Sequence, residues 1–482
     1  MSRLETTTIA ATEEAAAGSA TDVAGSLDPV TVGEFTTPSG TLFRFATAGS
    51  VDDGKSTLVG RLLHDSKAIL ADTLAAVTRT SAERGFGGSD GGVDLALLTD
   101  GLRAEREQGI TIDVAYRYFA TAARSFILAD CPGHVQYTKN TVTGASTADA
   151  VVVLIDARKG VLEQTRRHLS VLHLLRVPHV IIAVNKIDLV DFSESVFDGI
   201  VAEVSHVARS IGLAEPLVVP VSALAGDNVV EPSARTPWYH GSALLEILES
   251  LPSIDELEAA SDTVEPLRFP VQLVLRPQGG LAPGLRAEEF RDYRGYAGQL
   301  AAGSVNLGDS VTVLPSGKTT SVVGIDGPGG SHLASAAAPQ SVVLRLSDEL
   351  DIARGEMISG SGTTREVSQD LYSSLCWLSA KPLREGAKVL VKHGTRTVQA
   401  LVRAIIGKLD LDDFSLLPSS SLALNDIGTV QLRLAAPLPL EPYAEHRRTG
   451  AFLVIDPLDG NTLAAGMIGE RPGDSEEERY SI

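Results

Sequence analysis

Cysteine is scarce in this chain of 482 residues, which contains only Cys131 and Cys376. Two thiols are too few for a disulfide framework or for a cysteine-based zinc site, so the sequence excludes both. The ten histidines add no metal-ligand spacing, because His168 and His173 are five residues apart and fall on different faces of a helix. The fold must therefore rest on hydrophobic cores, for which a hydrophobic content of 44% is sufficient.

Long apolar runs and basic residues are also lacking. No stretch reaches the roughly 18 apolar residues of a membrane-spanning helix. The N-terminus carries Glu5, Glu13 and Glu14 where a secretory signal needs basic and then apolar residues. The 41 Lys and Arg are outnumbered by 61 Asp and Glu, and the net charge of −20 disfavours binding to nucleic acid or to anionic membranes. We expect a cytoplasmic protein.

Between residues 40 and 250, short apolar runs alternate with amphipathic segments. The predicted strands are 43–48, 124–129, 150–155, 180–184 and 217–221, and the predicted helices are 56–70 and 243–251. The uninterrupted apolar run Ala150–Ile155 is typical of a strand that is buried on both faces. This pattern predicts an α/β domain with a parallel-type sheet and helices on both faces.

After Pro252, helical periodicity nearly disappears, and short β-rich runs are separated by Gly, Pro, Asp and Ser. These runs include Phe269–Leu275, Val311–Leu314, Ser341–Leu346 and Lys388–Lys392. They predict two all-β barrel domains, with a boundary near 360–368, where a Ser-Gly-Ser-Gly-Thr-Thr run interrupts the pattern. The expected organisation is a flexible acidic tail, the α/β domain, two barrels and a polar tail, over 1–38, 39–262, 263–364, 365–468 and 469–482.

A phosphate-binding loop stands between the first predicted strand and helix. The segment Gly49-Ser-Val-Asp-Asp-Gly54-Lys55-Ser56 fits G-x-x-x-x-G-K-[ST], whose backbone N–H groups and helix N-terminus bind phosphate oxygens. Lys55 is expected to reach the β- and γ-phosphates, Ser56 to bind Mg²⁺ and Thr57 to contact the α-phosphate. The nucleotide-binding residues expected here are Gly49, Ser50, Val51, Asp52, Asp53, Gly54, Lys55, Ser56 and Thr57.

The role of the two acidic residues in the loop is open, and a second G-K-T run needs a separate interpretation. Asp52 and Asp53 are acidic for a phosphate site, and they either orient the backbone or bind a monovalent cation. A second G-K-T run at Ser316-Gly317-Lys318-Thr319 lacks the earlier glycine and lies in a hairpin pattern. We interpret it as a turn, which leaves a single nucleotide site.

Three further motifs follow successive strands in the order of a GTPase. In Asp130-Cys-Pro-Gly133-His134, the Asp is expected to hold the Mg²⁺ shell, Gly133 to sense the γ-phosphate and His134 to position water. In Asn185-Lys186-Ile-Asp188, the Asp188 carboxylate is expected to accept two hydrogen bonds from guanine, which selects GTP over ATP. Ser222-Ala223-Leu224 is expected to present a backbone N–H to guanine O6.

The segment Glu105-Arg-Glu-Gln-Gly-Ile-Thr111-Ile-Asp113 resembles the first switch of translational-type GTPases of the elongation factor Tu family. That resemblance implies that Thr111 provides a second protein hydroxyl to Mg²⁺ and that its backbone contacts the γ-phosphate. The alternative is an edge-strand residue without a ligand. With Thr111 included, the implied catalytic residues are His134, Lys55 and Thr111, and the implied metal ligands are Ser56, Thr111 and Asp130.

Several longer stretches, such as Gly101–Phe119 and Asp156–His168, resemble the large subunits of bacterial GTP-dependent sulfate adenylyltransferase from about residue 40 to 468. The resemblance implies a heterodimer or higher assembly in which a small subunit transfers the adenylyl group from ATP to sulfate. This chain would hydrolyse GTP to drive that reaction, with GTP and Mg²⁺ as cofactors. The pattern departs at Cys131, where the family often has Thr, and in the Ala-rich stretch 328–339. A C-terminal kinase with a second phosphate loop, found in some relatives, is not expected in this sequence.

Two other functions share features of this pattern. A translation elongation GTPase that binds aminoacyl-tRNA shares the same domains, but it needs clustered basic residues, and only short pairs such as Arg447-Arg448 occur. A non-enzymatic scaffold with a degenerate nucleotide site disagrees with the intact motifs. A pull-down and a hydrolysis assay distinguish these alternatives from a sulfate-activating GTPase.

Overall fold

The structure is a computed structural model that describes residues 42–66, 114–134, 138–260, 265–277, 292–361, 366–411 and 415–469. The predicted tail 1–38, the segment that contains Thr111 and nearly all of the predicted tail 469–482 lie outside these residues. Within the described part of the chain, no helix is long and apolar enough to span a membrane.

The α/β domain is built on a six-stranded sheet in the order β2-β3-β1-β4-β5-β6. Its strands are β1 (Leu42–Gly49), β2 (Ala115–Ala120), β3 (Ser125–Asp130), β4 (Ala150–Asp156), β5 (His179–Asn185) and β6 (Leu217–Pro220). All neighbours from β3 to β6 pair in parallel, as the sequence predicts. The edge strand β2 differs, because it was not among the predicted strands and it pairs with β3 in antiparallel fashion.

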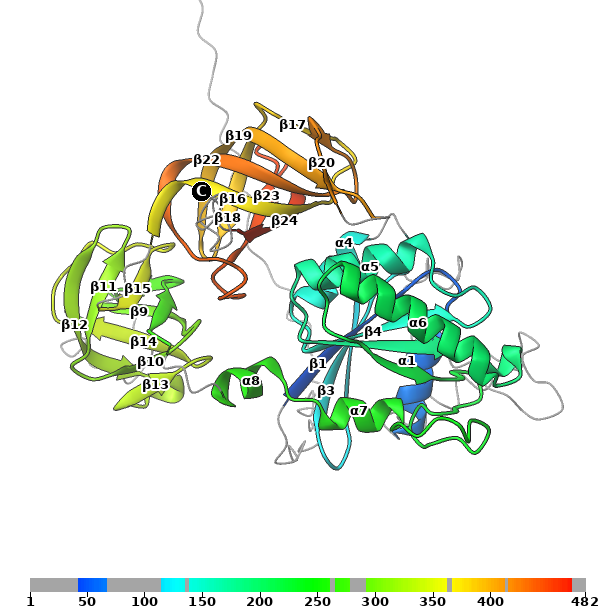
Figure 1. Cartoon of the computed structure of the whole chain (residues 1–482). Helices are drawn as coiled ribbons and strands as arrows, with labels where there is room; N and C mark the ends of the chain where they lie inside the picture. The colour runs from blue at the N-terminus through cyan, green and yellow to red at the C-terminus, as the bar shows by residue number, and fades with distance from the viewer. Residues whose placement is uncertain are drawn as a thin grey trace, which may run out of the picture. The chain divides into compact units, whose positions relative to one another are not determined.

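Helices cover both faces of this sheet (Figure 1). They are α1 (Lys55–Asp65), α4 (Thr138–Ser146), α5 (Glu163–Leu174), α6 (Glu194–Ser210) and α7 (Leu244–Ser250), with the 3-10 turn η3 (Ile187–Val190) and a further short helix α8 (Ile254–Ala260). Every residue of β4 is buried, and its side chains alternate between the two layers. Val151 and Val153 pack with α4, α5 and α6, whereas Val152 and Leu154 pack with α1 and α7.

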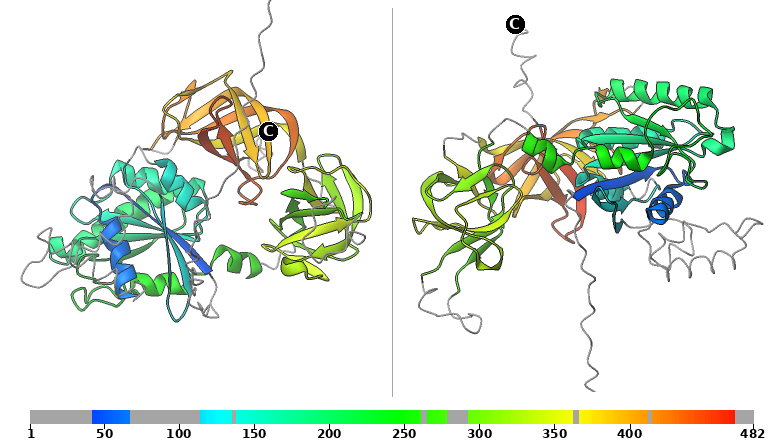
Figure 2. Two further views of the ribbon diagram at one scale, coloured as in Figure 1. Left: turned by 180° about the vertical axis from the view of Figure 1, so that it is seen from behind. Right: turned by 90° about the horizontal axis from the view of Figure 1, so that it is seen from below.

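Each of the two β domains is a seven-stranded sheet curled on itself (Figure 2). The first has the order β7-β15-β11-β12-β14-β9-β8, and the second has the order β18-β23-β24-β16-β22-β19-β20 with an additional β18–β19 pairing. The first contains β7 (Arg268–Pro270), β8 (Leu273–Leu275), β9 (Gly295–Gln299), β11 (Ser310–Leu314), β12 (Lys318–Asp326), β14 (Ser341–Leu346) and β15 (Met357–Gly360), beside the small pair β10 (Ser304–Asn306) and β13 (Ser335–Ala337) and the turn η4 (Pro328–Gly330). The second contains β16 (Glu366–Trp377), β18 (Lys388–His393), β19 (Arg396–Leu409), β20 (Leu416–Leu417), β22 (Ile427–Leu440), β23 (Ala451–Ile455) and β24 (Thr462–Ile468), beside β17 (Leu383–Arg384) and β21 (Ser421–Leu422).

The predicted fold class is confirmed, but one predicted strand is broken. Phe269–Leu275 divides into β7, which pairs with β15, and β8, which pairs with β9. At the break, the Val271 N–H donates to Glu356 O and the Gln272 N–H donates to Ala297 O, so the chain changes partner between these residues. The run is therefore a corner at which the chain passes from its pairing with β15 to its pairing with β9, as the sheet curls.

The second G-K-T run lies in a hairpin turn, as the sequence indicates. Gly317 has a φ of +73° between β11 and β12, and Lys318 is already the first residue of β12. No helix follows this turn, so it lacks the helix N-terminus that a phosphate loop needs.

Candidate nucleotide-binding site

The predicted motifs meet at one edge of the α/β sheet, where the parallel strands end. The ladder aligns Gly49 of β1 with Leu154 of β4, and Asp156 of β4 with Asn185 of β5. On the other side of β1, Thr47 aligns with Asp130 of β3. Open α/β sheets bind ligands at this carboxyl edge, so the topology gathers the phosphate loop and the base motif at one place.

The phosphate loop is held open by positive φ angles and by its own lysine. Gly49, Asp52 and Gly54 have φ of +145°, +67° and +92°. The Lys55 ammonium donates to the carbonyl oxygens of Gly49 at 2.9 Å and Ser50 at 2.8 Å. Burial lowers the pKa of Lys55, and nearby carboxylates, first among them Asp130, oppose that shift. Helix α1 starts after Gly54, which has no side chain to cap it, so the first-turn N–H groups face the loop.

The two loop acids have different roles. Asp53 is 2% exposed, and its Oδ2 accepts the Ser50 N–H at 2.7 Å. Burial raises the pKa of Asp53. Asp52 is exposed, and its carbonyl oxygen accepts a hydrogen bond from Lys186. Of the two alternatives left open by the sequence, Asp53 therefore orients the loop backbone.

The segment after β3 lies directly against the phosphate loop. The buried Asp130 accepts a hydrogen bond from the Thr47 hydroxyl at 2.8 Å. A Cβ added at Gly133 would lie 2.2 Å from Lys55 Nζ and 2.7 Å from Gly49 O, so only glycine fits there. His134 is exposed beside it. Cys131 is fully buried, and burial raises the pKa of its thiol, which makes it a packing residue.

Asn185 joins the phosphate loop to the two base motifs. Its Nδ2 donates to Asp53 O at 2.7 Å, and its Oδ1 accepts the Ala223 N–H at 2.9 Å. The Ala223 N–H, one of the donors expected for guanine O6, is therefore engaged by Asn185. Asp188 is half-buried at the start of η3, Ser222 is buried and Leu224 is exposed.

Sequence reasoning missed His168, which the structure places behind the phosphate loop. It lies on α5 with 1% of its surface exposed, and its ring faces the Gly49 backbone. Burial lowers its pKa to about 3, and the Lys55 charge adds to this effect. His168 therefore contacts the Gly49 backbone as a neutral imidazole. Spacing along α5 gives no signal for this contact, because it depends on the packing of α5 under β1.

His168 predicts a pH-dependent stability. The unfolded chain binds a proton at this side chain as the pH falls through 6.5, whereas the folded chain stays neutral to about pH 3. Above about pH 6.5, His168 therefore does not reduce the free energy of unfolding, and this free energy falls as the pH is lowered below that value. Linkage gives a loss of about 1.4 kcal/mol between pH 8 and pH 5.5.

The measurement is the urea midpoint at pH 8 and at pH 5.5 for wild type and His168→Asn. The variant is expected to be less stable at pH 8 but to lose less stability on acidification. His240→Asn, which changes an exposed histidine, is the matched control. An equal acid sensitivity in wild type and His168→Asn would contradict the prediction.

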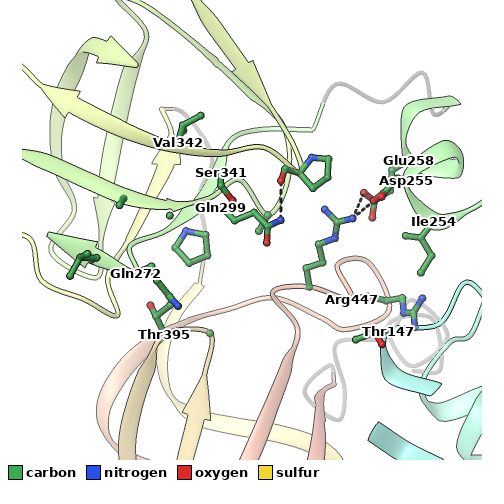
Figure 3. A pocket seen from close by; sticks show the side chains of 18 of the residues that line it. Thr147, Ile254, Asp255, Glu258, Gln272, Gln299, Ser341, Val342, Thr395 and Arg447 are labelled. Carbon is green, nitrogen blue, oxygen red and sulfur yellow. Dashed lines mark hydrogen bonds and ion pairs between the residues drawn. The ribbon is translucent and has the colours of Figure 1, made fainter. Parts of the chain in front are cut away.

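A further cavity lies away from this edge. It has a volume of about 1070 Å³ and is lined by Ile254, Gln272, Gln299, Thr395 and Arg447, among others (Figure 3). None of the phosphate-loop residues lines it. Its Arg448 is paired with Asp255 at 2.5 Å and Glu258 at 3.3 Å. The cavity and the phosphate loop are therefore separate features of the described chain.

Comparison with known proteins agrees with this arrangement. Residues 41–260 match the family model of the elongation factor Tu GTP binding domain, and residues 370–469 match the GTP-eEF1A C-terminal domain-like family. The chain is 48% identical over 430 residues to the sulfate adenylyltransferase subunit 1 of Teredinibacter turnerae, which covers 88% of this chain and 87% of that protein.

Two bifunctional proteins are also similar. The chain is 48% identical to the bifunctional enzyme CysN/CysC of Mycobacterium tuberculosis over 89% of this chain and 67% of that protein. It is 46% identical to the bifunctional enzyme NodQ of Rhizobium tropici over 89% of this chain and 65% of that protein. The chain thus spans about two thirds of the length of these bifunctional relatives. Taken with the motifs gathered at the sheet edge, these similarities show that the chain belongs to the sulfate adenylyltransferase subunit 1 family, with a GTP-binding domain of the elongation factor Tu type.

Proposed function

We propose that the chain is the GTPase subunit of a heteromeric sulfate adenylyltransferase. It hydrolyses GTP and drives the transfer of an adenylyl group from ATP to sulfate, which yields adenylylsulfate and diphosphate. The observation that carries the proposal is 48% identity to a subunit 1 protein over 87% of that protein's length, together with a complete set of nucleotide motifs. Because its substrates are ATP, GTP and sulfate, we place the reaction in the cytoplasm.

The partner is a small subunit that performs the adenylyl transfer, in a heterodimer or larger assembly. The mixed phosphate–sulfate anhydride is a high-energy bond, so its formation needs a second source of free energy. Hydrolysis of GTP supplies it by releasing the switch segments around Thr111 and Asp130–His134. A translation factor is not favoured, because the relatives are adenylyltransferase subunits and the chain is strongly acidic.

The phosphate-loop residues Gly49–Thr57 hold the triphosphate, with Lys55 at the β- and γ-phosphates. Gly133 senses the third phosphate, and His134 orients the attacking water. Asn185, Lys186, Asp188 and the Ser222–Leu224 segment form the guanine site. This assignment is supported by the hydrogen bonds of Asn185, which link the loop to both base motifs.

Mg²⁺ fits the donors at this site. The described residues contain no group of three or more His, Cys, Asp and Glu side chains suited to a metal. Mg²⁺ does not need such a cage, because it takes one or two protein oxygens together with phosphates and water. The Ser56 hydroxyl and the Asp130 carboxylate, which Thr47 orients, are oxygen donors of this kind. Thr111 is the third proposed ligand. When bound, Mg²⁺ neutralises charge on the phosphates.

The function is tested by mixing the chain with the small subunit and measuring diphosphate release that depends on ATP and sulfate. GTP is expected to raise the yield of adenylylsulfate well above its level without GTP. His134→Ala is expected to slow GTP turnover about 100-fold and to leave GTP binding nearly unchanged, since general positioning of water contributes this much. His206→Ala, at an exposed site on α6, is the control. Diphosphate release that is indifferent to GTP would overturn the function, and wild-type turnover in His134→Ala would remove that residue from the mechanism.

A further inference from the structure

A fully buried carboxylate lies between the phosphate loop and the base motif. Asp156 ends β4, its side chain is 0% exposed, and it aligns with Asn185 in the sheet. The turn that follows is tight, because the Lys159 and Gly160 N–H groups both donate to the Asp156 carbonyl oxygen. An ionised carboxylate removed from water is costly unless cations and hydrogen-bond donors surround it.

Arg158 provides most of these donors. Its Nε and Nη2 donate to the two carboxylate oxygens at 2.9 and 2.6 Å, and its backbone N–H donates to Oδ1 at 3.0 Å. This two-point contact uses the planar fork of the guanidinium, which a lysine lacks. Exposed ion pairs contribute little to stability. Here the carboxylate partner is buried, so the hydrogen bonds from Arg158 offset the cost of its desolvation.

The same carboxylate also holds Lys186. The Lys186 ammonium lies 3.1 Å from Asp156 Oδ2 and donates to the carbonyl oxygen of Asp52 in the phosphate loop. Lys186 has a φ of +62° and stands between Asn185 and Asp188. Its side chain is therefore a bridge from the base motif to the loop, and Asp156 fixes the position of that bridge.

The pKa of Asp156 agrees with its contacts to Arg158 and Lys186. Burial raises the pKa of Asp156, but the hydrogen bonds from Arg158 and Lys186 outweigh it and hold the pKa well below its usual range. Without Arg158, the buried carboxylate would draw the Lys186 ammonium toward itself and away from Asp52 O. The link between the loop and the base motif would then loosen.

We propose that Arg158 is a positioning residue for nucleotide binding, which acts through Asp156 and Lys186 to hold the phosphate loop and the guanine motif in register. Arg158 itself touches neither phosphate nor base in this role. The inference rests on the proposed GTP site and extends it to a residue outside the nucleotide-binding motifs.

The test is the Kd of a fluorescent GDP analogue and of a fluorescent non-hydrolysable GTP analogue for the full chain. Arg158→Ala is expected to raise both Kd values by about 10- to 100-fold, the effect of losing charged hydrogen bonds. The two factors should be equal, because the bridge involves the loop backbone and the base motif, which both nucleotides contact. Arg158→Lys should recover part of the loss, since an ammonium can replace one arm of the fork.

Two further variants separate positioning from general damage. Arg166→Ala removes another arginine, whose pair with Glu203 is long at 3.4 Å, and should leave both Kd values unchanged. In an Asp156→Asn background, Arg158→Ala should add little, because the charge that it serves is gone.

Other results would contradict the proposed role of Arg158. Wild-type Kd values in Arg158→Ala, or a loss confined to the GTP analogue, would overturn the proposal. So would a loss that Arg158→Lys does not relieve and that persists unchanged in the Asp156→Asn background. If the wild-type chain bound neither analogue, the nucleotide site itself would be wrong, which is a separate outcome from failure of the Arg158 variants alone.

Discussion

Asp188→Asn is expected to weaken GTP binding by roughly 100- to 1,000-fold and to make XTP the preferred nucleotide. The carboxylate accepts two hydrogen bonds from guanine, and an amide places a donor against the guanine amino group, so a buried polar pair is lost. Xanthine carries an oxygen at that position and accepts from the new amide. The backbone supports this assignment, because Ile187 is fully buried and its N–H donates to Val221 O at 3.3 Å. Asp188 is thus presented from a fixed platform.

The measurement is competition of GTP and XTP against a fluorescent GDP analogue for wild type and variant. Asp191→Asn is the matched control, since it makes the same charge change three residues later, at an exposed site with a φ of +55° that Asn tolerates. The control should retain the preference for GTP. An Asp188→Asn chain that still prefers GTP would move base recognition to another residue.

The sequence predicts that these motifs lie together, for a topological reason. Parallel strands bring their carboxyl ends to one edge, so motifs that directly follow β1, β3 and β5 must meet there. The loop from Gly49 to Ser56 and the Asn185–Asp188 motif are identified by their residue patterns, and the parallel topology predicts that they lie together. The order of the motifs along the chain therefore predicts that they are close together, although it gives no distances.

The supporting contacts could not be predicted in the same way. Arg158 reaches Asp156 across a turn, and Lys186 reaches both Asp156 and Asp52, so the network depends on the register of β4 against β5. His168 supports Gly49 only because α5 packs under the loop. Side chains with the same spacing on a surface helix would have no such partners.

The edge strand β2 shows a related limit. Strands buried on both faces read as continuous apolar runs, but β2 alternates exposed Tyr116 and Tyr118 with buried Phe119 and half-buried Arg117. It therefore lacks the continuous buried apolar run that marks β4, although it pairs with β3 over its whole length. The corner at Val271 was missed for the opposite reason, because an apolar run there continues through a change of pairing partner.

Gly54→Ala is expected to raise the Kd for GDP and GTP by more than about 100-fold, because one methyl group would disconnect the loop from both base motifs. A Cβ at this position would lie 2.4 Å from Asn185 Nδ2. That atom donates to Asp53 O at 2.7 Å, and the other end of the same amide accepts the Ala223 N–H. Displacing Asn185 breaks both hydrogen bonds at about 1 kcal/mol each and also strains a φ of +92°, which costs a further 1–2 kcal/mol or so.

A glycine with a similar angle and open surroundings separates these two causes. Gly308 has a φ of +89° in the first β domain, and nothing lies within 4 Å of its Cβ position. Gly308→Ala should therefore lower the unfolding temperature slightly and leave nucleotide binding unchanged. Gly54→Ala should lose binding while its barrels remain folded, as followed by circular dichroism. Affinity within a few-fold of wild type in Gly54→Ala would mean that Asn185 yields without cost, and the coupling of phosphate loop to base motif would then need a carrier other than its side-chain amide.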